Sequence, residues 1–175
     1  MPRHVAFLRA INVGGHTVTM ERLRAVFEAQ GFANVETFIA SGNVVFDTRA
    51  AAGPKLEARI GAALRQALGY EVATFLRSPA EVAAIAAHEP FERPGAALNV
   101  AFVHQLPDAA AKRRVLALRT ELDDFIVRGR EIWWRCAVRQ SESKRSNAAI
   151  EKALGAPSTV RGVNTVRKLA AKLGA

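Results

Sequence analysis

The sequence of 175 residues contains a single cysteine and no long apolar run. One cysteine, Cys136, cannot form an internal disulfide or a cysteine-based metal cluster, and its apolar neighbours predict a buried, unreactive thiol. No apolar stretch approaches the roughly 20 residues that a membrane helix needs. Arg3, His4 and Arg9 also interrupt the N-terminus, where a signal peptide would carry its apolar segment. We therefore expect a cytoplasmic protein that does not enter a membrane.

The motifs of several common enzyme classes are also missing. The sequence has no Walker loop, no G-x-G-x-x-G, no H-E-x-x-H, no G-x-S-x-G and no C-x-x-C. The four histidines, His4, His16, His88 and His104, lack the spacing of metal ligands. We therefore predict no metal site and no cofactor, and the motifs leave open whether the protein is an enzyme.

Positive charge is present in excess and is concentrated in the last quarter of the chain. The net charge is +9, and residues 131–175 carry nine basic and three acidic side chains. Residues 1–77 carry nine and six, and residues 78–130 carry seven of each. The last segment therefore supplies +6 of the net charge. This imbalance favours an anionic partner, such as nucleic acid or a phosphorylated small molecule, although a basic surface also serves solubility.

The first half of the chain predicts the order strand, helix, strand, strand, helix, strand. Apolar and β-rich runs predict strands at residues 4–9, 35–39, 43–47 and 71–76. Thr19 is expected to cap a helix that Gly31 ends, and Gly53-Pro54 opens a second helix that Gly69 ends. This order is that of a ferredoxin-like, split βαβ unit, which we assign to residues 1–77.

The second half, residues 78–175, begins by repeating this pattern. A capping box at residues 78–81 predicts a helix, and Asp108 is expected to cap another. Further strands are predicted at residues 98–104, 125–127 and 131–137. Two helices then take the place of one helix and a closing strand. The first ends at Leu154-Gly155, and the second spans about 160–173.

Short stretches of sequence recur between the two halves. Val5-Ala6-Phe7 recurs as Val100-Ala101-Phe102, at an offset of 95. At an offset of 87, Ile39, Gly42 and Phe46 recur as Ile126, Gly129 and Trp133. These matches support a duplicated unit. We therefore predict an α+β fold of two ferredoxin-like halves, with two extra C-terminal helices.

The predicted topology brings two loops of the first half together. The first two strands run parallel because a helix joins them, and the hairpin makes the third antiparallel, so the end of strand one and the hairpin share an edge. Glycines there permit close backbone approach, and a helix start with basic side chains favours an anion. The same residue types are also ordinary in turns. The predicted ligand-binding residues at this edge are Arg9, Asn12, Gly14, Gly15, His16, Ser41, Gly42 and Asn43.

The last predicted helix carries a basic face. Arg161, Thr165, Lys168 and Lys172 fall at helical spacing, with Asn164 beside them. The opposite, apolar face holds Val163, Val166, Ala170 and Leu173. A basic face of this kind can lie on phosphates, and a solvated amphipathic helix shows the same pattern. Arg161, Asn164, Thr165 and Lys168 are therefore further candidate ligand-binding residues.

Three segments of the chain resemble one bacterial family. LRAINVGG at residues 8–15, TFIASGNVVF at residues 37–46 and TVRGVNTVRKL at residues 159–169 are similar to motifs of the domain-of-unknown-function 1697 family. Ala10 stands where the family often has glycine. Gly162 and Val163 replace the usual Asn-Trp, so no role of that tryptophan carries over. The resemblance implies a cytoplasmic protein of two ferredoxin-like halves with no established activity.

Three functions are consistent with these observations. The first is a binding protein for a phosphate-bearing or otherwise anionic ligand, nucleic acid included, at the edge formed by residues 9–16 and 41–43. The second is a small-molecule enzyme or sensor that uses the same edge, where His16 is the only nearby histidine. The third is a structural or interaction module in which the motif residues serve packing. The sequence does not distinguish oligomeric states.

Overall fold

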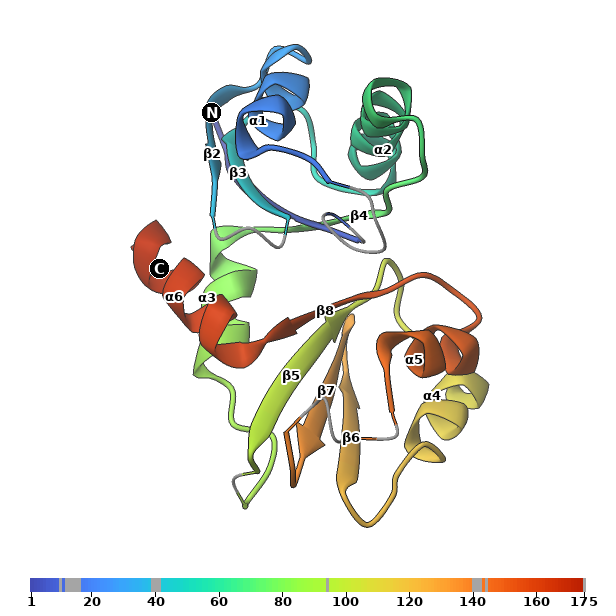
Figure 1. Ribbon diagram of the computed structural model, residues 1–175. Helices are drawn as coiled ribbons and strands as arrows, with labels where there is room; N and C mark the ends of the chain where they lie inside the picture. The colour runs from blue at the N-terminus through green and yellow to red at the C-terminus, as the bar shows by residue number, and fades with distance from the viewer. Residues whose placement is uncertain are drawn as a thin grey trace. The chain divides into compact units, whose positions relative to one another are not determined.

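The computed structural model describes residues 1–9, 11, 17–38, 42–93, 95–139, 143 and 145–174 (Figure 1). The chain divides into two compact units. Unit 1 comprises Met1–Ala83 with Leu173–Ala175, and unit 2 comprises Ala84–Lys172. The division falls inside helix α3 (Pro79–Ala87), whereas the sequence assigns that helix to the second half from its first residue.

Unit 1 contains a four-stranded antiparallel sheet with the order β2-β3-β1-β4. Its strands are β1 (Arg3–Leu8), β2 (Ala33–Thr37), β3 (Asn43–Asp47) and β4 (Thr74–Arg77). Helices α1 (Met20–Glu28) and α2 (Pro54–Leu68) pack on one face of this sheet, as Figure 1 shows. The predicted ferredoxin-like order of the first half is therefore confirmed.

Strand β1 is central and is covered on both faces, as its apolar sequence predicts. Val5, Ala6, Phe7 and Leu8 are each at most 1% exposed. Ala6 and Leu8 join the core formed with α1 and α2, whereas Val5 and Phe7 point to the other face because side chains alternate along a strand. A strand without a polar face must be covered on both sides, and pairing with β3 and β4 places β1 in the interior of its sheet.

Capping residues set several helix ends at the predicted positions, although α1 ends at Glu28 with Ala29 as its C-cap, before the predicted Gly31. The Thr19 hydroxyl accepts a hydrogen bond from the Arg22 N–H at 3.1 Å at the start of α1. Gly69 ends α2 in the left-handed conformation, with φ 83°. At α3, the Ser78 N–H donates to Glu81 Oε1 and the Glu81 N–H donates to Ser78 Oγ, both at 3.1 Å. This reciprocal pair is the predicted capping box.

Unit 2 repeats the sheet of unit 1, with the strand order β6-β7-β5-β8. Its strands are β5 (Ala97–Phe102), β6 (Asp123–Arg128), β7 (Glu131–Cys136) and β8 (Thr159–Gly162). Its helices are α4 (Ala109–Leu116), α5 (Asn147–Leu154) and α6 (Val163–Leu173), with α3 continuing into the unit. Residues of α4 and α5 share a core with one face of the sheet.

The second half contains a closing strand that the sequence analysis missed. Strand β8 pairs antiparallel with β5, with Thr159 opposite Phe102 and Arg161 opposite Val100. The last helix therefore begins at Val163 rather than near residue 160, and α5 occupies the place of α2. A strand of four residues is too short to show alternation, and its residues also fit the helical spacing that follows. Pairing with β5, a contact distant in sequence, decides its conformation.

The pairing registers relate the two sheets residue by residue. Val5 lies opposite Val45 and Arg77, and Val100 lies opposite Trp133 and Arg161. The two Val-Ala-Phe stretches thus occupy the same place in both sheets. Phe46 pairs with His4, however, and Trp134 pairs with Asn99. The equivalent of Phe46 is therefore Trp134, and the predicted match to Trp133 is shifted by one residue.

None of the helices in the described part of the chain combines the length and the apolarity required to cross a membrane.

Candidate functional site

The end of β1 and the β2–β3 hairpin meet at one edge of the unit 1 sheet, as the topology predicts. The Leu8 N–H donates to the Gly42 carbonyl at 2.8 Å. Gly42 has φ 82°, and a Cβ atom at that position would lie 3.1 Å from Cβ of Ile11. A larger residue would therefore strain the backbone and crowd Ile11. The Arg9 N–H donates to the Ala73 carbonyl at 2.9 Å, which fixes the chain as it leaves β1.

Asn43 serves the hairpin itself. Its side chain is fully buried, and its Nδ2 donates to the Phe38 carbonyl at 2.9 Å. The Phe38 N–H in turn donates to the Asn43 carbonyl at 2.9 Å. Of the predicted edge residues, Arg9 is half-buried, and Asn12, Gly14, Gly15, His16 and Ser41 lie outside the described residues. Ligand binding at this edge stays a prediction.

Arg161 is not on the basic helix face to which the sequence assigns it. It lies in β8, is 6% exposed, and its Nη1 donates to Thr159 Oγ1 at 2.7 Å and to the Val160 carbonyl at 3.0 Å. Burial lowers the pKa of Arg161 to about 10. Arg77 occupies the equivalent place in unit 1, is 1% exposed and donates from Nη1 to the Leu76 carbonyl at 2.8 Å. Both arginine side chains are therefore buried rather than on the surface.

The remaining residues of the predicted face do lie on α6. Asn164 and Lys168 are exposed and Thr165 is half-buried. Val163, Val166, Leu169 and Ala170 are buried. The helix is therefore amphipathic as predicted, although Leu169 takes the buried place that the sequence gives to Leu173. Among these candidates, Asn164 lines a cavity of unit 2.

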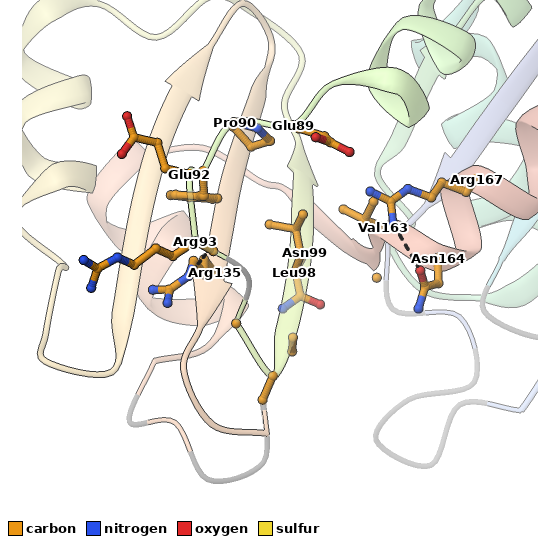
Figure 2. A pocket seen from close by; sticks show the side chains of 15 residues that line it. Glu89, Pro90, Glu92, Arg93, Leu98, Asn99, Arg135, Val163, Asn164 and Arg167 are labelled. Atoms are coloured by element: carbon orange, nitrogen blue, oxygen red, sulfur yellow. Dashed lines mark hydrogen bonds between the residues drawn. The ribbon is translucent and has the colours of Figure 1, made fainter.

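This cavity has a volume of about 550 Å³ and lies between the start of β5, a segment formed by residues 89–93, 95 and 96, the end of β8 and the start of α6. Figure 2 shows the side chains that line it, with Asn99 between Arg93 and Arg135 on one side and Val163 with Asn164 on the other. Arg167 also lines the cavity. The lining carries a net positive charge, because it holds three arginines and two glutamates: Arg93, Arg135, Arg167, Glu89 and Glu92.

The segment that forms one wall of the cavity is held against β7. A Cβ atom on Gly95 would lie 2.3 Å from the Cys136 carbonyl oxygen and 2.9 Å from Cγ of Arg135, so only glycine fits at this crossing. The Arg135 Nε donates to the Arg93 carbonyl at 2.8 Å, which ties strand and segment together. The wall is therefore fixed by the fold of unit 2.

Asn99 is a buried polar residue among those that line the cavity. It lies within β5, opposite Trp134 on one side and Gly162 on the other, and is 4% exposed. Its Nδ2 has no hydrogen-bond partner among the described residues. Asn99 is not among the residues predicted from the sequence. An asparagine inside an apolar strand run, Leu98 to Phe102, is the signal that could have identified it.

Cys136 belongs to a separate polar cluster. Asp123 is 3% exposed and accepts hydrogen bonds from Trp134 Nε1 at 2.9 Å, Ser143 Oγ at 2.6 Å and Thr120 Oγ1 at 2.7 Å. Burial, reinforced by Asp123, raises the pKa of the Cys136 thiol to about 11. The prediction of a buried thiol is confirmed, and its low reactivity stays a prediction. Within the described ranges, His, Cys, Asp and Glu side chains form no group of three suited to a metal ion.

Comparison with known proteins gives a family and a fold. No curated protein matches the chain. Among solved structures, the conserved bacterial protein SP0830 from Streptococcus pneumoniae has a TM-score of 0.75 at 23% identity, over 100% of this chain and 99% of that chain. At this identity the likeness shows the fold alone. The family model described as "Protein of unknown function (DUF1697)" matches residues 1–133, which include the first two motifs of the resemblance. The chain therefore belongs to the DUF1697 family of proteins of unknown function.

Proposed function

We propose that the protein binds an anionic ligand at the edge of unit 1, where the chain after β1 meets the β2–β3 hairpin. The observation that carries the proposal is the hydrogen bond from the Leu8 N–H to the Gly42 carbonyl. This bond, with the close packing of Gly42 on Ile11, brings Arg9 next to the hairpin. Binding residues are commonly held in this way, on loops positioned by a rigid sheet.

The residues at this edge would divide into two groups. Gly42 and Asn43 hold the hairpin, because the first packs against Ile11 and the second bonds to Phe38. Arg9 would supply the cation, since a guanidinium group can donate two parallel hydrogen bonds to a phosphate or carboxylate. Further donors would come from the predicted residues Asn12, Gly14, Gly15, His16 and Ser41. The net charge of +9 would attract such a ligand over longer distances.

The same contacts also favour a second candidate, a structural role for the hairpin motif. Asn43 is fully buried and its amide bonds within the hairpin, so its place in the motif follows from folding alone. If this role accounts for the whole motif, Ser41→Ala will lower the melting temperature and no anion will bind at the edge. Ligand binding and stability must therefore be measured on the same variants.

The test is binding of inorganic phosphate, pyrophosphate, adenosine monophosphate and a short single-stranded oligonucleotide by calorimetry at low salt. We expect Arg9→Gln to weaken binding by about 10- to 100-fold, because a hydrogen bond to a charged group contributes about 1.5–3 kcal/mol. Arg24→Gln is the matched control, since Arg24 is exposed on α1 and pairs with Glu28. An oligonucleotide ligand would also bind more weakly as salt rises.

Two results would overturn the proposal. The first is the absence of binding by any of these anions at low salt. The second is equal affinity of the wild type and Arg9→Gln for the anion that binds best. His16→Ala addresses the enzyme or sensor alternative, because a ligand that still binds to this variant does not depend on histidine chemistry.

A further inference from the structure

Unit 2 repeats the edge at which β1 of unit 1 meets the β2–β3 hairpin. The Leu8 N–H donates to the Gly42 carbonyl at 2.8 Å, and the Val103 N–H donates to the Arg130 carbonyl at 3.0 Å. The two bonds are equivalent, because Leu8 and Val103 each lie three residues beyond the matched valines of β1 and β5. The end of β5 and the β6–β7 hairpin therefore form the same kind of edge as the site proposed in unit 1.

The hairpin at this second edge is built from arginine and glycine. Arg128 and Glu131 are paired across β6 and β7, so Gly129 and Arg130 form a two-residue turn. Gly129 has φ 60°, which favours glycine at the first position of such a turn. Of the described atoms, only Glu131 Oε2, at 4.0 Å, would lie within 4 Å of a Cβ atom on Gly129. The tip of the hairpin is therefore open to a ligand.

Arg128 is the exposed cation of this hairpin. Its side chain lies on the face of the sheet that Trp133 occupies, opposite the face that packs on α4 and α5, because side chains alternate along a strand. Arg128 Nη1 lies 2.7 Å from His88 Nδ1, and the His88 ring stands edge-on to Trp133 with the centroids 5.2 Å apart. A guanidinium group only donates, so His88 accepts this bond as a neutral ring. Burial, with Arg128 beside it, lowers the pKa of His88 and favours that neutral form.

This contact orients the guanidinium group and leaves most of its donors available. Apart from His88, no described residue forms a hydrogen bond or an ion pair with Arg128. A guanidinium group can donate two parallel hydrogen bonds to the oxygens of a phosphate. Residues 128–131 carry two positive charges, Arg128 and Arg130, and one negative charge, Glu131. The hairpin therefore presents a net positive charge beside an oriented donor.

An open, basic hairpin suits a long anion better than a small one. A small anion would contact few groups on an open surface, whereas a chain of phosphates can contact the hairpin and other basic side chains together. The excess of nine basic over three acidic residues in segment 131–175 favours such a partner. We propose that the β6–β7 hairpin of unit 2 contacts the phosphate backbone of a nucleic acid through Arg128. This assignment rests on the proposed function, because it gives unit 2 the role proposed for the equivalent edge of unit 1.

The test measures binding of a labelled oligonucleotide, single-stranded and duplex, to the full-length protein by fluorescence anisotropy at about 50–200 mM salt. Arg128→Gln should weaken binding about 5- to 15-fold at the lowest salt, and lower the slope of log affinity against log salt by about 0.7–0.9, because one phosphate contact is lost. Arg128→Lys keeps the charge and should keep the slope of the wild type. Arg113→Gln, at an exposed position of α4, is the matched control and should bind like the wild type.

Nuclear magnetic resonance separates the two edges. The backbone amide signal of Gly129 reports on the hairpin of unit 2, and that of Gly42 reports on the hairpin of unit 1. We expect the oligonucleotide to shift the Gly129 signal in the wild type and in Arg9→Gln. If only Gly42 shifts and Arg128→Gln binds like the wild type, the site in unit 2 is overturned and the proposed function stands. If only Gly129 shifts and Arg9→Gln binds like the wild type, the proposed function fails and the site in unit 2 stands.

Two further results would overturn the site in unit 2. The first is an equal loss of affinity in Arg113→Gln and Arg128→Gln, which would show that charge attracts the oligonucleotide without local contact. The second is a hexaglutamate peptide that binds as tightly as the oligonucleotide and shifts Gly129, which would assign the surface to an acidic protein. Arg128 is exposed, so its variants should keep the melting temperature of the wild type, and a change in binding then reports on the contact itself.

Discussion

Because the Asn99 Nδ2 is buried without a partner among the described residues, we predict that replacing Asn99 with leucine will stabilise the protein. Asn99 is 4% exposed and its Nδ2 has no partner among the described residues. Leaving a buried donor unsatisfied costs about 1–3 kcal/mol, and leucine has nearly the same shape without the polar atoms. For a chain of this length, 1 kcal/mol changes the melting temperature by about 2–4 °C. We therefore expect Asn99→Leu to raise the melting temperature by about 2–12 °C.

Asn43→Leu is the matched control for this prediction. Asn43 is also buried, but its Nδ2 donates to the Phe38 carbonyl at 2.9 Å. Its replacement leaves that carbonyl without its partner and should lower the free energy of unfolding by about 1–3 kcal/mol. Thermal and denaturant unfolding show whether each variant is more or less stable than the wild type. If Asn99→Leu is destabilised as Asn43→Leu is, the reasoning from the unsatisfied Nδ2 of Asn99 is refuted.

Three further predictions concern packing and titration. Gly95→Ala should lower the free energy of unfolding by about 1–3 kcal/mol, since its Cβ would lie 2.3 Å from the Cys136 carbonyl oxygen. Gly162→Ala is the control and should be tolerated, because its Cβ meets no atom within 4 Å. The denaturant midpoints of both variants measure the difference. Cys136 should resist thiol reagents at pH 8 in the native protein and react on unfolding, because burial, with Asp123, raises the pKa of its thiol to about 11. Labelling of Cys136 at a rate independent of unfolding would contradict this prediction. Burial lowers the pKa of His4 below its usual 6.5, so the unfolded chain binds a proton first as the pH falls. The stability of the wild type should therefore fall below about pH 6.5 more steeply than that of His4→Phe, and equal slopes would count against this account.

The secondary structure of the first half follows from local sequence signals. Thr19 caps α1, Gly69 ends α2 and the Ser78–Glu81 pair opens α3, each through contacts within a few residues. Such contacts depend on the residue types and their spacing alone. The burial of β1 on both faces is likewise visible in its unbroken apolar run. These features, and the meeting of β1 with the hairpin, could be predicted because short-range chemistry and chain topology determine them.

Strand β8 and the cavity of unit 2 could not be predicted in that way. Thr159 to Gly162 becomes a strand only because β5 offers an open edge about sixty residues earlier in the chain, and this pairing buries Arg161. The cavity likewise combines Gly95, Asn99, Arg135 and Arg167, which lie on separate elements. Residue types and their spacing thus determined most of the elements and the duplicated order, and the resemblance of three motifs indicated the family. The tertiary structure alone decided which polar groups are buried, because burial depends on contacts between segments distant in sequence.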